Sequence, residues 1–230
     1  MGSNDFVTLF FLAAAVLIFF QLRSVLGRRT GNEKPPVDPF QRNSSAAPAD
    51  DSKVVTVSRR EDGEAENRYA AIDAFAEPGS AINGQLRQVA DVDPSFVPQE
   101  FLKGAKIAYE MVVVAFANGD RKTLKSLLSK EVYDGFDAAI SERERQGELL
   151  KTTFVGIEKA EILSAGLKDQ EEQLTVRIVS QLISATYDRN GTLIDGDAEN
   201  VGDVNDIWTF ARDSRSRDPN WKLIATESEQ

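Results

Sequence analysis

The chain has 230 residues, enough for one ordinary domain with appendages, and its 27 Lys and Arg against 37 Asp and Glu give a formal net charge of −10. Because this balance offers no chain-wide attraction to phosphates, we expect no nucleic-acid partner. The chain contains no Cys and no His, which excludes disulfides, cysteine nucleophiles, histidine-based triads and zinc sites built on thiolate or imidazole. We therefore expect neither a metal nor another cofactor.

The most apolar part of the chain is the uncharged run from Phe6 to Leu22, in which only Thr8 and Gln21 are polar. Its length is at the short end of the ~17–25 residues that a membrane-spanning helix needs. A cleavable signal peptide fits less well because residues 1–5 contain an acid and no base, and a buried core helix fits less well because a polar stretch follows. The sequence favours a membrane span. The residues expected to anchor it are Phe6, Phe10, Phe11, Leu12, Val16, Leu17, Ile18, Phe19 and Phe20.

A basic cluster follows this run directly, with Arg23, Arg28 and Arg29 and no acid among them. Short basic flanks stay on the cytoplasmic side of a membrane. We therefore interpret residues 1–29 as a membrane anchor with a basic flank, which places the rest of the chain in the cytoplasm.

Residues 30–68 predict a disordered linker because they contain four prolines, few aromatic residues and charges of both signs. Residues 69–92 then predict an amphipathic helical segment, in which Ser80 is a plausible N-cap and Ile82, Leu86 and Val89 share one face.

The globular domain is expected over residues 93–227, and its first half reads as helices. Residues 99–117 predict a long helix with two apolar stripes, and this width favours a place at the centre of the core. One stripe holds Phe101, Ala105, Ala108 and Val112, and the other holds Ile107, Val113 and Val114. Asn118-Gly119-Asp120 predicts a helix end followed by a new N-cap, and Ser129 caps a further helix.

After Gly147 the apolar pattern changes to the two-residue alternation of strands. Helices followed by an antiparallel sheet indicate the α+β class. Five strands are predicted, over residues 150–157, 159–165, 173–187, 201–211 and 221–226.

Two stretches together resemble a known family. They are FLKGAKIAYEMVVVAFANGDRKTLKSLLSKEVYDGFDAAISERE (101–144) and VNDIWTFARDSRSRDPNWKLIAT (204–226). Over about residues 93–227 the chain is similar to the C-terminal domain of the forty-four-kilodalton subunit of the mitochondrial inner-membrane protein-import translocase, and in particular to bacterial relatives of that subunit.

The resemblance implies a cone-shaped fold similar to nuclear transport factor two and ketosteroid isomerase, in which a curved antiparallel sheet wraps around helices and leaves an apolar cavity. It also implies an adaptor, because the mitochondrial subunit tethers a heat-shock-seventy chaperone and associates with inner-membrane lipid. The expected location is a bacterial inner membrane, with one span and a cytoplasmic C-terminal domain. This chain differs from the mitochondrial subunit in having its own membrane span and in lacking a long basic, helical region before the domain.

One carboxylate stands out as a candidate catalytic group. Folds of this shape can raise the pKa of a pocket carboxylate and use it as a general base, so Asp206 with Tyr109 or Tyr133 is the pair to examine. Alternatively, Asp206 caps a strand edge or pairs with an arginine such as Arg177. The residues expected to line a ligand pocket are Phe101, Ala105, Tyr109, Phe116, Asp206, Trp208 and Phe210.

The leading function hypothesis is a membrane-tethered adaptor or binding module that acts on proteins at the inner membrane, in protein translocation or membrane-protein assembly. Two alternatives stay open: a small-molecule enzyme of the isomerase or hydratase type that uses Asp206, and a lipid-binding domain. The expected partners are the membrane and other proteins.

Overall fold

The computed structural model describes residues 68–168, 170–216, 218 and 220–228. The predicted anchor and all but the last residue of the predicted linker lie outside these residues. Within the described part of the chain, no helix is long and apolar enough to cross a membrane.

The helices come first in the chain and are bounded largely by the capping residues that the sequence predicts. Residues 68–75 are helical, and they are followed by α3 (Ala81–Val92), α4 (Pro98–Asn118), α5 (Arg121–Leu127) and α6 (Lys130–Gln146). The side chains of Ser80, Asp120 and Ser129 accept hydrogen bonds from the first turns of α3, α5 and α6, as expected of N-caps. Gly119 ends α4 with a φ of 68°, a left-handed conformation that suits glycine.

The strands form one antiparallel sheet in the order β1-β2-β3-β4. Their bounds are β1 (Leu149–Lys168), β2 (Glu171–Tyr187), β3 (Leu193–Asp213) and β4 (Lys222–Ser228). The prediction of five strands was wrong, because the first two are a single strand. The pairing of β1 with β2 shifts between Phe154 and Gly156 and again between Ile157 and Lys159, and each shift inverts the in–out alternation without breaking the ladder.

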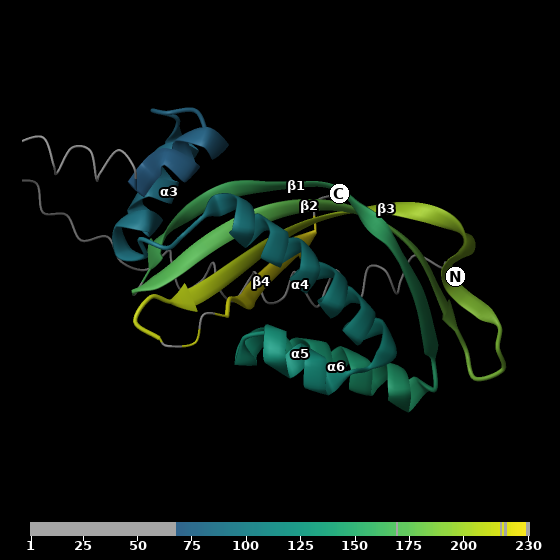
Figure 1. Cartoon of the computed structure of the whole chain (residues 1–230). Coiled ribbons are helices and arrows are strands. Elements are labelled where there is room, and N and C mark those ends of the chain that lie inside the picture. Colours follow the sequence, from purple (N-terminus) through teal and green to yellow (C-terminus); the bar gives the residue numbers. More distant parts are fainter. Residues whose placement is uncertain (1–67, 169, 217, 219, 229–230) are drawn as a thin grey trace, which may run out of the picture.

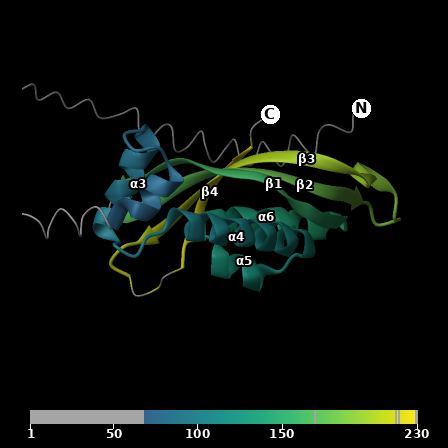
Figure 2. The same ribbon diagram turned by 45° about the horizontal axis from the view of Figure 1, so that its top comes forward.

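The sheet is curved, and α4, α5 and α6 lie on its concave side (Figure 1). The view in Figure 2 shows the same layering, with α3 and residues 68–75 at one end of the sheet, next to β1. Helices packed in a curved antiparallel sheet confirm the predicted α+β class.

The core lies between α4 and the concave face of the sheet. On α4 the buried stripe holds Phe101, Ala105, Tyr109 and Val112, and on β2 it holds Leu174, Val176 and Ile178. The second apolar stripe predicted for this helix is not buried throughout, because Ile107 is 54% exposed. Since α5 and α6 cover only part of the outer side of α4, this helix presents one face to the core rather than two.

The helices of residues 68–92 belong to the same core. Ile72, Leu86 and Val89 are fully buried in one hydrophobic cluster with residues of the sheet. The amphipathic face predicted for this segment therefore packs against the domain.

Candidate functional site

A row of aromatic rings joins α4 to β3 inside the curve of the sheet. The rings of Tyr109 and Trp208 have centroids 4.5 Å apart, and those of Phe101 and Phe210 lie 6.0 Å apart, edge to face. Ala105 lies between the two aromatic residues on the buried stripe of α4 and is 4% exposed. The structure thus brings the predicted helix residues opposite the predicted strand residues.

Phe116 lies further along α4 and packs on a different element. Its ring meets Phe136 of α6 edge to face at 5.2 Å, and the guanidinium of Arg143 lies over it at 5.2 Å. Its described ring contacts therefore lie at the junction of α4 and α6, away from Trp208 and Phe210.

A buried chain of hydrogen bonds lies beside the aromatic row. The Tyr109 hydroxyl donates to Oδ2 of Asp206 across 2.8 Å and also lies 2.8 Å from Oγ of Ser180. The Ser228 hydroxyl donates to Oδ1 of Asp206, also across 2.8 Å. The network therefore joins four elements, α4, β2, β3 and β4, with Ser180 of β2 attached through the Tyr109 hydroxyl. Of the two tyrosines considered from the sequence, it is Tyr109 that binds Asp206.

The surroundings of this carboxylate favour its protonated form. Burial raises the pKa of Asp206 above its ordinary value, against the opposing effect of the hydrogen bonds from Tyr109 and Ser228. Burial and the neighbouring Asp206 also raise the pKa of Tyr109, so the phenol keeps its proton. A raised pKa makes a carboxylate a stronger base, and a general base needs this property.

The two oxygens of Asp206 are, however, already bound by hydroxyl groups. Tyr109 and Ser180 are fully buried, so a substrate would have to reach the carboxylate from the side of Ser228 and displace its hydroxyl. The observed geometry is that of a satisfied polar network, and a catalytic use of it requires a ligand that replaces Ser228.

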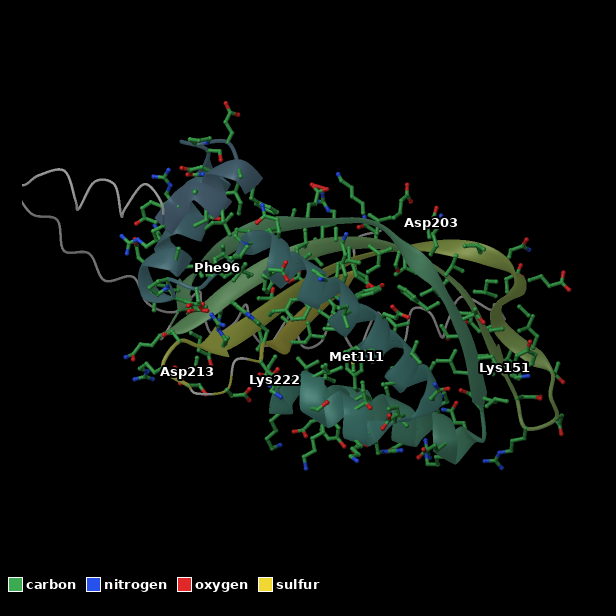
Figure 3. The ribbon with its side chains drawn as sticks, viewed as in Figure 1. Phe96, Met111, Lys151, Asp203, Asp213 and Lys222 are labelled. Atoms are coloured by element: carbon green, nitrogen blue, oxygen red, sulfur yellow. The ribbon has the colours of Figure 1, made fainter. Side chains whose placement is uncertain are left out.

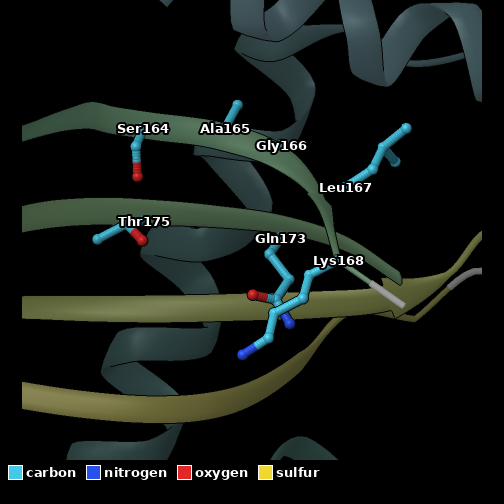
Figure 4. A pocket seen from close by; sticks show the side chains of 7 residues that line it. All are labelled: Ser164, Ala165, Gly166, Leu167, Lys168, Gln173 and Thr175. Atoms are coloured by element: carbon cyan, nitrogen blue, oxygen red, sulfur yellow. The ribbon is translucent and has the colours of Figure 1, made fainter. Parts of the chain in front are cut away.

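Two hollows of the domain lie away from these residues. One, of about 210 Å³, is at the β1–β2 end of the sheet (Figure 4), and the other, of about 260 Å³, adjoins the start of β4. The first is lined by Ser164, Ala165, Gly166, Leu167, Lys168, Gln173 and Thr175. Neither hollow includes a residue of the predicted ligand pocket, so an apolar pocket at those residues stays a prediction. Among the described residues, no cluster of three or more acidic side chains is placed to hold a metal ion.

Sequence reasoning missed a second buried polar cluster, at the end of the sheet where Phe96 lies (Figure 3). Arg212 donates to Oε2 of Glu172 from Nε at 3.0 Å and from Nη2 at 2.6 Å, and it also donates to Asp93. Its guanidinium lies 4.8 Å from the centre of the Trp221 ring. The available signal was the position of Glu172 on the core-facing side of β2, two residues before Leu174.

Comparison with known proteins identifies the family. The model of the Tim44-like domain matches residues 82–228, which comprise α3 to β4 and include both polar clusters. The chain belongs to the Tim44-like domain family.

The curated relatives are proteins of the mitochondrial inner membrane. A probable mitochondrial import inner membrane translocase subunit of Caenorhabditis elegans is 24% identical to the chain, over 66% of this chain and 38% of the worm protein. The human mitochondrial import inner membrane translocase subunit TIM44 is 22% identical, over 63% of this chain and 33% of the human protein. The chain therefore spans about a third of the length of these relatives.

Solved structures offer weaker likenesses to this Tim44-like domain. The intermembrane space region of the chloroplast protein ARC6 is 12% identical, with a TM-score of 0.39 over 55% of this chain and 95% of that chain. A periplasmic fragment of TraM is 14% identical, with a TM-score of 0.36 over 56% of this chain and 97% of that chain. At scores this low, neither likeness carries an argument about fold or function.

Proposed function

We propose that this Tim44-like chain is a membrane-tethered adaptor that binds proteins at a bacterial inner membrane, in protein translocation or membrane-protein assembly. The observation that carries the proposal is the match of residues 82–228 to the Tim44-like domain, whose curated relatives are import translocase subunits. The apolar run from Phe6 to Leu22 and the following arginines support a single span with the domain in the cytoplasm.

The packing of the domain also supports binding rather than chemistry. The rings of Tyr109, Trp208, Phe101 and Phe210 contact one another where the family resemblance implies a cavity, and both oxygens of Asp206 are occupied. An adaptor needs a stable scaffold and a tether, which raises the effective concentration of the domain near its partners.

A second candidate is a small-molecule enzyme of the isomerase or hydratase type. One observation favours it: Asp206 is a buried carboxylate with a raised pKa, and it is hydrogen-bonded to a tyrosine. The reaction would use Asp206 as the base, with the substrate in place of the Ser228 hydroxyl at one carboxylate oxygen and Tyr109 bound to the other.

Recovery of partners from detergent-solubilised membranes tests the adaptor proposal. Three tagged chains are compared: the full chain, a chain without residues 1–29, and a chain in which residues 6–22 are replaced by an unrelated membrane span. We expect the same set of proteins with the first and third chains and a smaller yield with the second, because the tether concentrates the domain at the membrane. Recovery of no protein above an empty-tag control with the full chain would contradict the proposal.

A further inference from the structure

The sequence contains three Asn-Gly steps, at Asn83, Asn118 and Asn190. At such a step the backbone nitrogen of the glycine can attack Cγ of the asparagine, because glycine has no side chain to hinder the approach. The attack closes a succinimide ring, and ammonia leaves with the side-chain nitrogen and the proton of the glycine N–H. Water then opens the ring to give aspartate or isoaspartate. Since the glycine nitrogen must swing toward the side chain, the fold decides which of the three steps reacts.

Asn83 lies inside α3 and is held there by its side chain. It is 2% exposed, and its side-chain nitrogen donates to Asp73 at 2.9 Å and to the carbonyl of Ala76 at 3.0 Å. The N–H of Gly84 donates to the carbonyl of Ser80 at 3.1 Å. Reaction at Asn83 would therefore require this part of α3 to unfold and the buried amide to leave its partners.

Asn118 is exposed, but it is the last residue of α4, where the chain is fixed on both sides. The N–H of Gly119 donates to carbonyls of the last helical turn, and a Cβ added at Gly119 would lie 3.5 Å from Cγ2 of Ile140 on α6. Asp120 follows directly as the N-cap of α5. Closing a succinimide at Asn118 would move this junction of three helices, so the fold protects the second step as well.

Asn190 lies in the turn between β2 and β3, at the end of the sheet far from α3 (Figure 1). Both Asn190 and Gly191 are exposed, and no atom beyond the chain neighbours lies within 4 Å of a Cβ added at Gly191. Gly191 has a φ of 81°, and its N–H donates to the carbonyl of Asp188 at 3.0 Å. The hydrogen bonds of the turn, rather than packing, hold this step closed.

The side chain of Asp188 supplies several of these bonds. Its Oδ1 accepts from the backbone N–H groups of Asn190 and Thr192, each at 2.8 Å, and its Oδ2 accepts from the side-chain nitrogen of Asn190 at 3.4 Å. Because the backbone of Asn190 must rotate before Cγ can meet the Gly191 nitrogen, these bonds oppose the reaction. Opening this exposed turn nevertheless costs less free energy than unfolding a helix of the core.

We propose that Asn190 is the deamidation site of the folded chain, and that Asp188 sets the rate of the reaction by holding the turn closed. The product adds a negative charge beside Asp188, and the isoaspartate form also adds one carbon to the main chain. The turn carries Arg189, which donates to the carbonyls of Gln146 at 2.7 Å and Arg145 at 2.6 Å, at the end of α6. Deamidation therefore changes the turn that joins β2 and β3 to α6.

Mass spectrometry of the full chain in detergent measures the reaction, because each event replaces an amide NH₂ by OH in one identifiable peptide. In mildly alkaline buffer, we expect the peptide with Asn190 to convert at least about 10-fold faster than those with Asn83 and Asn118. In urea the three peptides should convert at similar rates, since all three steps have glycine as the second residue. Asn190→Gln is the control, because a longer side chain closes the ring less readily, and the fast conversion should disappear.

Asp188→Ala tests the role of the turn. The loss of two hydrogen bonds to backbone N–H groups predicts a rise in the rate at Asn190 of about 5- to 30-fold, with the rates at the other two steps unchanged. Asp197→Ala is the matched control, because Asp197 of β3 accepts similar bonds from the N–H groups of Glu199 and Asn200, away from the turn. This variant should leave the rate at Asn190 at its native value.

Conversion at Asn83 or Asn118 before Asn190 in the folded chain would overturn the assignment. The assignment would also fail if the folded chain showed no conversion at Asn190 over the time in which the chain in urea converts completely. An unchanged rate in Asp188→Ala, or an equal rise at all three steps, would overturn the role of Asp188.

Discussion

The Tyr109 hydroxyl donates a hydrogen bond of 2.8 Å to Asp206, joining α4 to β3 across 97 positions of sequence. Because the carboxylate lies among apolar rings and is bound by two hydroxyl groups, its protonation couples to the stability of the whole core. The effect of pH on stability, the contribution of packing and the candidate catalytic role of Asp206 can therefore be tested separately around this hydrogen bond.

The pH dependence of folding should report on Asp206. Since burial raises its pKa in the folded state, the folded protein binds this proton more tightly than the unfolded chain does. The contribution of Asp206 to stability is then fully present below the ordinary carboxyl pKa, and it is lost as the pH rises from that value through the raised one. Asp206→Asn removes this dependence. The free energy of unfolding of the native chain, minus that of the variant, should therefore fall as the pH rises from the ordinary carboxyl pKa through the raised pKa of Asp206.

Urea unfolding at several pH values provides the measurement. Asp206→Asn keeps the shape of the side chain and one acceptor oxygen for the hydroxyl groups of Tyr109 and Ser228. Other titrating groups, such as Glu172, are common to both chains and cancel in the difference. A difference that rises with pH would show that Asp206 is stabilised as a carboxylate in the folded state.

Trp208 should contribute strongly to stability through packing. The ring is 4% exposed and contacts both Tyr109 and Phe210, so Trp208→Ala is expected to cost about 3–5 kcal/mol in the free energy of unfolding. Leu149→Ala, at a residue 54% exposed, is the control and should change stability by less than about 0.5 kcal/mol. A loss below about 1 kcal/mol at Trp208 would indicate that space beside the ring can absorb the truncation, which would favour a ligand cavity there.

Local patterns in the sequence were sufficient for the helix limits and for the main buried face. Ser80, Asp120 and Ser129 cap helices because their side chains satisfy backbone N–H groups a few residues away, which is a purely local interaction. The sequence also placed Tyr109 opposite Trp208. That prediction combined the apolar stripe of the helix and the alternation of the strand with the family resemblance.

Register and long-range ion pairs could not be obtained in this way. The bulges at Val155 and Glu158 make one strand look like two in the sequence, since a single extra residue reverses the alternation on which the prediction depends. The cluster of Asp93, Glu172 and Arg212 joins residues 119 positions apart at its widest, so no spacing rule predicts it. Ile107 looked like core because hydropathy alone does not show which sides of α4 are covered.

The orientation of the chain in the membrane can be measured with single cysteines, because none occurs naturally. A cysteine at Ser3 should react with a membrane-impermeant reagent in intact cells, and one at Ser44 should react only after permeabilisation. This expectation rests on the cluster of Arg23, Arg28 and Arg29, because short basic flanks of a membrane span stay on the cytoplasmic side. Labelling of Ser44→Cys in intact cells, with Ser3→Cys protected, would place the domain on the outer side and reverse the proposed topology.

The adaptor and enzyme proposals differ in which change to the chain abolishes function in cells. An enzyme that uses Asp206 as its base would lose activity in Asp206→Asn while keeping its fold and its partners, because an amide cannot accept the substrate proton. An adaptor draws its affinity from apolar contacts and from confinement at the membrane, and neither depends on that proton. We therefore expect cells with Asp206→Asn to grow and secrete like cells with the native chain. Deletion of residues 6–22 should lower both the recovery of partners and function in cells, even when the variant is expressed at the same level. Loss of function in Asp206→Asn, in a protein that unfolds at the same urea concentration and recovers the same partners, would decide for the enzyme.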